Sequence, residues 1–156
     1  MTSRVLRARD APAGFRELTT LDLVHYQDYF EIRTTSSATE AHWARAMFGD
    51  VADRTERFIW HGLLRLRLLG HGPSEDAIAG WAFVRHTDGA IMATEGPLIR
   101  VNLVFVTSRS TVGVATFVQY SGWIGRAIWG LLAYIHRALM PGLLVKAANR
   151  LNRAPR

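Results

Sequence analysis

The chain has 156 residues, of which 49% are hydrophobic and none is cysteine, and its formal net charge is +6. This length and composition predict one folded domain with a sizeable core, and they exclude disordered and disulfide-framework proteins. Without cysteine the chain has no thiolate nucleophile and no Cys-ligated zinc, and this usage is typical of a reducing cytoplasm.

The start of the chain is polar and carries no membrane signal. Residues 1–20 lack the apolar segment of a secretory signal. Because Pro12 and Gly14 interrupt them, we expect a flexible arm ahead of a single domain over residues 21–156. No run reaches the ~18 uninterrupted apolar residues expected of a spanning helix. These features predict a cytoplasmic protein, with peripheral attachment at the inner membrane face left open.

The first regular elements are a strand and two short helices. In segment 25–33, apolar and polar residues alternate well enough to predict a strand. Thr39 and the serines before it predict the N-cap of a helix that ends near Gly49. A second helix is predicted from Val51 to about Leu69, before the glycines that follow.

Four consecutive strands come next. They are predicted over 78–86, 90–95, 98–107 and 111–120, and the short breaks between them contain hairpin residues, so an antiparallel meander is expected. Both faces of the last two strands are largely apolar, and each face therefore needs a cover.

The last predicted helix starts near Gly122 and is apolar around most of its circumference. Such a helix is buried on two sides, or it has one side against a ligand or a bilayer. Pro141 and Gly142 are expected to kink or interrupt it before a basic tail.

Charge is unevenly distributed along the chain: residues 1–95 carry eleven Arg or Lys against thirteen Asp or Glu (net −2), whereas residues 96–156 carry eight Arg or Lys and no Asp or Glu (net +8). This half suits a partner with an apolar body and an anionic head.

Five short blocks of the sequence form a recognisable set: His25–Ile32, Trp43–Gly49, Leu63–Arg67, Gly125-Arg126 and His136-Arg137. Together they resemble a bacterial family described only as a domain of unknown function, related to the START-like (SRPBCC, helix-grip) superfamily. The chain departs from that family at Glu95-Gly-Pro-Leu98, where an Asp-Arg-His-Leu-like run is usual, and at Tyr134, where proline is usual.

The resemblance implies an α+β helix-grip fold, in which a curved antiparallel sheet wraps around a long C-terminal helix and two short helices follow the first strand. Superfamily members bind lipids, sterols, polyketides or hormones in an apolar cavity, and some cyclise polyketides. We therefore expect non-catalytic binding of a small hydrophobic, lipid-like or polyketide-like molecule between sheet and C-terminal helix. The oligomeric state stays open.

The candidate ligand-binding residues are apolar side chains with a few polar anchors. Arg100 and Asn102 would hold an oxygen of the ligand, unless their face is the outer, solvated one. The sheet face that lines the cavity is not decided by a period of two, so Ile99, Val101, Leu103 and Phe105 are the rival lining. The favoured set is Trp81, Phe83, Arg100, Asn102, Val104, Phe117, Trp129, Leu132 and His136.

Two other functions remain open. A cyclase or dehydratase would use His136 or Glu95 as acid or base, although a core histidine bonded to the sheet is the more ordinary fate of His136. A peripheral membrane protein would bring Trp123, Trp129 and the basic tail to anionic lipid. No metal or cofactor is expected, because the six histidines form no ligand motif and no phosphate-binding glycine motif occurs. Nucleic acid is not expected either, since the tail lacks stacking aromatics.

Overall fold

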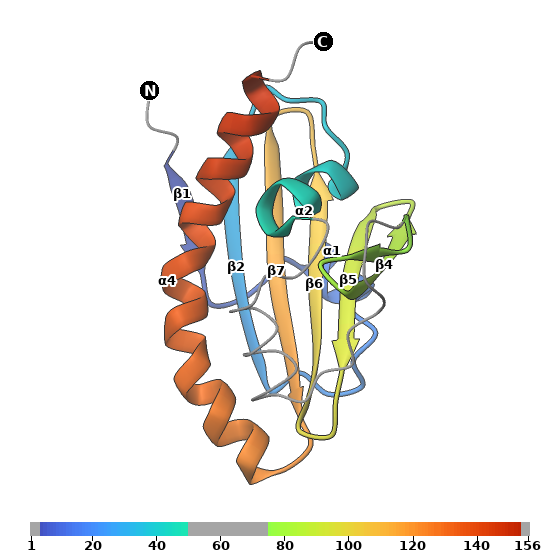
Figure 1. The fold of residues 1–156 in the computed structure, drawn as a ribbon, viewed down its shortest axis with the longest axis vertical. Coiled ribbons are helices and arrows are strands. Elements are labelled where there is room, and N and C mark those ends of the chain that lie inside the picture. The colour runs from blue at the N-terminus through green and yellow to red at the C-terminus, as the bar shows by residue number, and fades with distance from the viewer. Residues whose placement is uncertain (1–3, 50–74, 154–156) are drawn as a thin grey trace.

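Within the described residues, seven antiparallel strands form one unclosed, curved sheet in the order β1-β2-β7-β6-β5-β4-β3 (Figure 1). The structure is a computed structural model and describes residues 4–49 and 75–153. The strands are β1 (Val5–Ala8), β2 (Tyr26–Arg33), β3 (Ala77–Ile78), β4 (Trp81–His86), β5 (Gly89–Glu95), β6 (Ile99–Thr107) and β7 (Thr111–Tyr120). The helices are α1 (Ala13–Leu18), α2 (Glu40–Phe48) and α4 (Trp123–Arg153). This α+β layout confirms the predicted helix-grip fold class.

Helices cover both faces of the sheet. On one face, called here the α4 side, α4 packs against α2 and also contacts β2, β1 and β7. On the opposite face, the α1 side, α1 contacts β5 and β6. Alternate residues of β6 therefore enter two different cores. Ile99, Val101, Leu103 and Phe105 belong to the core on the α4 side, and Val104 belongs to the core on the α1 side.

The N-terminal segment differs from the expected flexible arm. Strand β1 pairs antiparallel with β2, from Val5 opposite Ile32 to Ala8 opposite Tyr29. The ring of Phe15 in α1 is buried and meets the ring of Tyr29 edge-on at 5.0 Å. The α1 side of the sheet is apolar and needs a cover, and burying Phe15 there compensates the entropy lost by ordering the segment.

Two further boundaries were predicted wrongly. The strand predicted over 78–86 is a hairpin of β3 and β4, because Ala79 (φ 52°) and Gly80 (φ 82°) turn the chain with positive φ. Of the kink or interruption predicted at Pro141, the interruption is absent, since α4 continues through this residue to Arg153. Pro141 and its neighbour Met140 are buried, so tertiary packing outweighs the lost helical hydrogen bond. The helix predicted over 51–69 lies outside the described residues.

Candidate functional site

A buried polar cluster joins α4 to the sheet. The Nε2 atom of His136 lies 3.0 Å from Asp28 Oδ2 on β2 and 2.9 Å from Thr116 Oγ1 on β7. Asp28 and Thr116 face each other across the β2–β7 ladder, so both side chains point to the α4 side. The Tyr26 hydroxyl donates to the same Asp28 Oδ2 at 2.7 Å. A charged group thus lies between α4 and the sheet with its side chain only 4% exposed.

Aromatic rings surround this cluster, called here the Asp28–His136 centre. Trp129 lies 5.5 Å from the His136 ring and meets Tyr26 edge-on at 5.4 Å. Phe30 lies 6.4 Å from the His136 ring. Burial raises the pKa of Tyr26 above its usual range, and the neighbouring Asp28 carboxylate raises it further, so this phenol stays protonated and keeps donating.

Two buried polar atoms of the centre have no partner among the described residues. Within the described part of the chain, neither Asp28 Oδ1 nor Trp129 Nε1 has a hydrogen-bond partner, although both atoms are buried. Asp28 Oδ1 is a hydrogen-bond acceptor, and Trp129 Nε1 is a donor. Both recorded polar contacts of His136 use Nε2, and no described residue bonds its Nδ1. Native proteins rarely leave such atoms unpaired, and each exception asks for an explanation.

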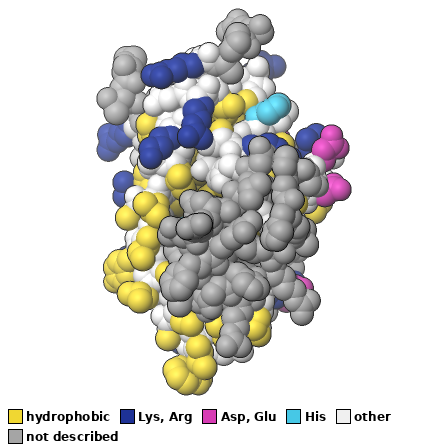
Figure 2. All heavy atoms as spheres, viewed as in Figure 1, with side chains coloured by type: hydrophobic (Ala, Val, Ile, Leu, Met, Phe, Trp, Pro, Cys, Tyr) yellow, Lys and Arg dark blue, Asp and Glu magenta, His cyan; other side chains and the backbone are white. Residues whose placement is uncertain are grey.

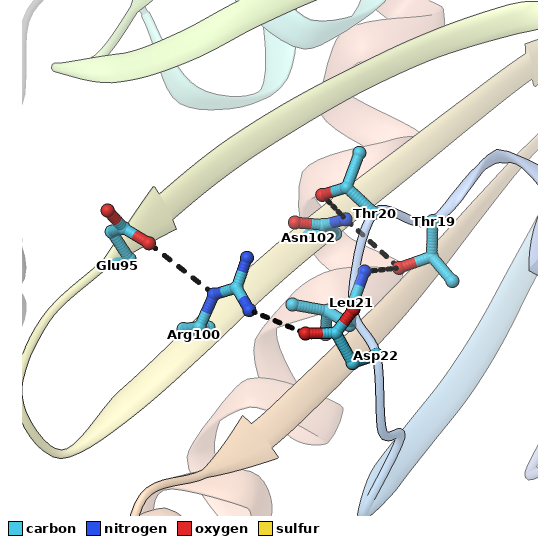
Figure 3. A network of polar contacts seen from close by, with 7 residues as sticks. All are labelled: Thr19, Thr20, Leu21, Asp22, Glu95, Arg100 and Asn102. Carbon is cyan, nitrogen blue, oxygen red and sulfur yellow. Dashed lines mark hydrogen bonds and ion pairs between the residues drawn. The ribbon is translucent and has the colours of Figure 1, made fainter.

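A second polar network holds the N-terminal segment to the α1 side (Figure 3). Arg100 Nε lies 3.4 Å from Glu95 Oε2, and Arg100 Nη1 lies 3.5 Å from Asp22 Oδ2. The Asn102 amide lies 2.9 Å from Thr20 Oγ1. With its oxygen turned toward the Thr20 backbone N–H, the amide nitrogen donates to the Val101 carbonyl, which satisfies both ends. The ion pairs are long and partly exposed, so they stabilise little.

A small pocket lies beside this network. Its volume is ≈ 280 Å³, near the lower limit for small-molecule sites. Its residues are Thr20, Leu21, Ala82, Ala93, Thr94, Glu95, Arg100 and Asn102. The small side chains of Ala82 and Ala93, which pair across β4 and β5, help to form its hollow. This pocket is on the α1 side, away from α4.

The predicted ligand-binding residues divide between the two faces. Trp81, Phe83, Trp129 and Leu132 are buried in the core on the α4 side, where His136 also lies. Val104 and Phe117 are buried on the α1 side, with Arg100 and Asn102. Arg100 and Asn102 therefore cannot anchor a ligand between sheet and α4. The rival lining, residues 99, 101, 103 and 105, is the one on the α4 side, where α2 contacts β6.

His136 and Glu95, the candidate acid or base groups of a cyclase or dehydratase, do not converge on one cavity. Glu95 and Arg100 pair across β5 and β6 and share the α1 side. His136 lies on the α4 side. The two groups are thus on opposite faces of the sheet and cannot act on one substrate atom. His136 instead has Asp28 and Thr116, which the sequence reasoning missed.

One sequence signal pointed to Asp28. The inward positions of β2 are Tyr26, Asp28, Phe30 and Ile32, so an acid interrupts an apolar row at a period of two. Such a residue is either paired in the core or functional. The sequence offered no means of pairing Asp28 with a helix residue 108 positions later.

The outer face of α4 is apolar and exposed. Trp123 is 78% exposed and Leu131 71%. Hydrophobic side chains follow the edge formed by α4, and basic side chains gather toward the end where its C-terminal part lies (Figure 2). By length and composition α4 could cross a membrane, but a third of its most apolar stretch is buried inside the protein. The exposed large hydrophobic residues of α4 are Trp123, Ile124, Leu131, Tyr134, Ile135 and Leu139.

Neither a metal site in the described residues nor a similar known protein indicates a function for this chain. Among residues 4–49 and 75–153, no three His, Asp or Glu side chains are grouped as a metal site would require. Comparison with known proteins finds no matching family model, no similar curated protein and no similar solved structure.

Proposed function

We propose that the protein binds the surface of anionic membranes through the outer face of α4. The observation that supports this most directly is the row of exposed apolar side chains on a helix that carries no carboxylate. Water-exposed apolar rows of this length mark interaction sites in soluble proteins, because leaving them in water costs free energy.

The composition of the row suits a bilayer surface. Leu131, Ile135 and Leu139 offer aliphatic side chains for the acyl boundary. Trp123 and Tyr134 are the aromatic types that prefer the headgroup level. Burying the exposed part of Leu131 contributes about 1–2 kcal/mol, so several such residues acting together give useful affinity.

Basic residues extend the same surface. Lys146, Arg150 and Arg153 form the exposed end of α4. Strand β1, which contacts α4, adds the exposed Arg7, with Arg9 just after it. Each such cation near an anionic membrane contributes about 1 kcal/mol. Charge and apolar area therefore favour the same partner.

A second copy of the chain fits this face less well. Two α4 helices would bring only positive charge to their interface, because the chain has no Asp or Glu after Glu95. An interface between copies of one protein gains from opposite charges, and like charges facing each other oppose it. Insertion across a bilayer is also disfavoured, since Met140 and Leu144 on the inner face of α4 are fully buried in the core.

The predicted internal ligand, bound between sheet and C-terminal helix, stays a prediction. The described residues that face this space are buried in the core and contact one another. Surface association accounts for the exposed face of α4, which an internal ligand leaves unexplained. It is therefore the function that we favour.

Vesicle sedimentation tests the proposal. The full chain is mixed with vesicles of phosphatidylcholine alone or of phosphatidylcholine with phosphatidylserine. We expect binding to the anionic vesicles that weakens as salt is raised. Leu131→Asn should weaken binding about tenfold, since the lost burial is about 1–2 kcal/mol. Leu23→Asn is the matched control, because Leu23 is 60% exposed but lies outside α4. Equal binding to both vesicle types, or equal effects of the two variants, would overturn the proposal.

A further inference from the structure

We infer that the pocket on the α1 side binds a small aliphatic α-amino acid, with Arg100 holding its carboxylate and Glu95 and Asp22 holding its ammonium group. This inference does not depend on membrane association, because the pocket and α4 lie on opposite faces of the sheet. It rests on three features of the pocket: charges of both signs at one end, small apolar side chains at the other, and a buried amide whose hydrogen bonds are already made.

The first feature is the weak pairing of Arg100 (Figure 3). Its guanidinium lies 3.4 Å from Glu95 and 3.5 Å from Asp22, whereas a charge-assisted hydrogen bond is usually about 2.7–2.9 Å long. The side chains of Glu95 and Asp22 are 58% and 86% exposed, so these ion pairs are exchanged at little cost. A guanidinium has five N–H donors and can hold a carboxylate with two of them. Arg100 can therefore take up a ligand carboxylate without losing a strong contact.

The charges at this end of the pocket decide the class of ligand. Arg100 lies between Glu95 and Asp22 (Figure 3). Two carboxylates oppose a ligand that carries only a negative charge, and the guanidinium opposes a ligand that carries only a positive one. An α-amino acid carries both charges on one carbon atom. Its carboxylate can contact Arg100 while its ammonium group contacts a flanking acid, so both charges are compensated.

The second feature is the apolar end of the pocket. Ala82 and Ala93 pair across β4 and β5, and the buried Leu21 lies beside them in the pocket wall. Ala93 precedes Glu95 by two positions on the same face of β5, so the apolar and charged ends are about 7 Å apart. The volume of ≈ 280 Å³ equals that of about nine water molecules, which is room for a molecule the size of leucine.

The third feature is the state of Asn102, which is 2% exposed. With its amide turned as described above, it donates to the Val101 carbonyl and accepts from the Thr20 N–H at 2.8 Å. Its polar atoms are thus satisfied without a ligand. Asn102 is therefore a positioning residue, which holds Thr20 and Leu21 in the wall. The ligand is recognised by the charged residues instead.

Nuclear magnetic resonance of the full chain with leucine tests the site. We expect millimolar leucine to shift the methyl resonances of Ala82 and Ala93. Arg100→Gln should weaken binding about ten- to a hundredfold, because hydrogen bonds to a charged group are lost. Arg85→Gln, at an exposed arginine of β4 outside the pocket, is the matched control. Ala93→Leu fills the hollow and should abolish binding, which decides the question if Arg100→Gln does not fold. If leucine shifts neither alanine methyl, the inference is wrong.

A ligand series tests the need for both charges. 3-Methylbutylamine is leucine without its carboxylate, and 4-methylpentanoate is leucine without its ammonium group. We expect leucine to bind at least about tenfold more tightly than either. Equal binding of the three would show that only apolar contact matters, and tighter binding of the amine would show a plain cation site. Either result would overturn the inference. Leu131→Asn, the variant that tests membrane binding, should bind leucine normally, so each proposal can fail alone.

Discussion

Replacing Gly125 with alanine should destabilise the protein, whereas the same change at Gly130 should stabilise it. A Cβ atom at position 125 would lie 2.1 Å from the carbonyl oxygen of Leu98 and 3.2 Å from Cγ2 of Ile99. That oxygen belongs to the backbone and also accepts from the Ser121 N–H at 2.9 Å, so it cannot easily move. A Cβ atom at position 130 would meet no atom within 4 Å. The two glycines lie in the same helix, and only their surroundings differ.

The expected magnitudes follow from packing and helix propensity. Overpacking a core typically costs about 1–3 kcal/mol, and a clash with backbone belongs at the upper end of that range. Exchanging glycine for alanine inside a helix contributes about 1 kcal/mol of stability. Gly125→Ala should therefore lose about 2 kcal/mol, while Gly130→Ala gains up to about 1 kcal/mol.

Urea unfolding followed by far-ultraviolet circular dichroism measures both values. The slope of unfolding free energy with urea should stay constant, and only the midpoints should move, in opposite directions. If both variants move the midpoint equally, the first turn of α4 does not contact the β5–β6 connection, and the docking of α4 described above is wrong.

Three further outcomes are expected from individual side chains. Phe15→Ala should lose about 3 kcal/mol in urea unfolding because its ring is buried against the sheet, whereas an unchanged midpoint would mean that the segment is a loose arm. Thr39→Ala should lose about 1 kcal/mol, because the Thr39 side chain accepts from the backbone N–H three residues on in α2, and Ser37→Ala is the control. Burial raises the pKa values of Tyr26 and Tyr29 above the usual 10.0, so their phenols bind protons more tightly when the protein is folded. Their contribution to stability should be full below pH 10.0 and should be lost as the pH rises further, and tyrosinate absorbance should show fewer ionised tyrosines in folded than in urea-unfolded protein just above that pH. Equal tyrosinate absorbance in the two states would contradict this.

The local sequence pattern predicted which strands and helices form, but not always where each one begins and ends. Strand β7 begins and ends where the alternation predicts, at Thr111 and Tyr120. The hairpin at Ala79 and Gly80 was hidden, because an apolar run shows no break when a turn is made of small residues. At Pro141 the sequence predicted an interruption of the helix, but α4 continues through this residue because it is packed in the core.

The candidate site was harder to predict for a different reason. Period two shows that Arg100 and Asn102 share a face, but not which of the two faces α4 covers. The choice depends on where α4 and α1 dock, and docking follows from the total apolar area that each arrangement removes from water. The structure places these two residues on the α1 side, under the N-terminal segment.

Local chemistry along the chain was enough to predict an antiparallel sheet and a helical cover, because periodicity and turn residues are properties of neighbouring positions. The sequence also shows directly that residues 96–156 carry no Asp or Glu. Packing alone decided that one side of α4 stays in water, that residues 5–18 join the sheet, and that His136 meets Asp28. These outcomes depend on contacts between residues that are far apart in the sequence. The sequence alone does not give the spatial distances between such residues.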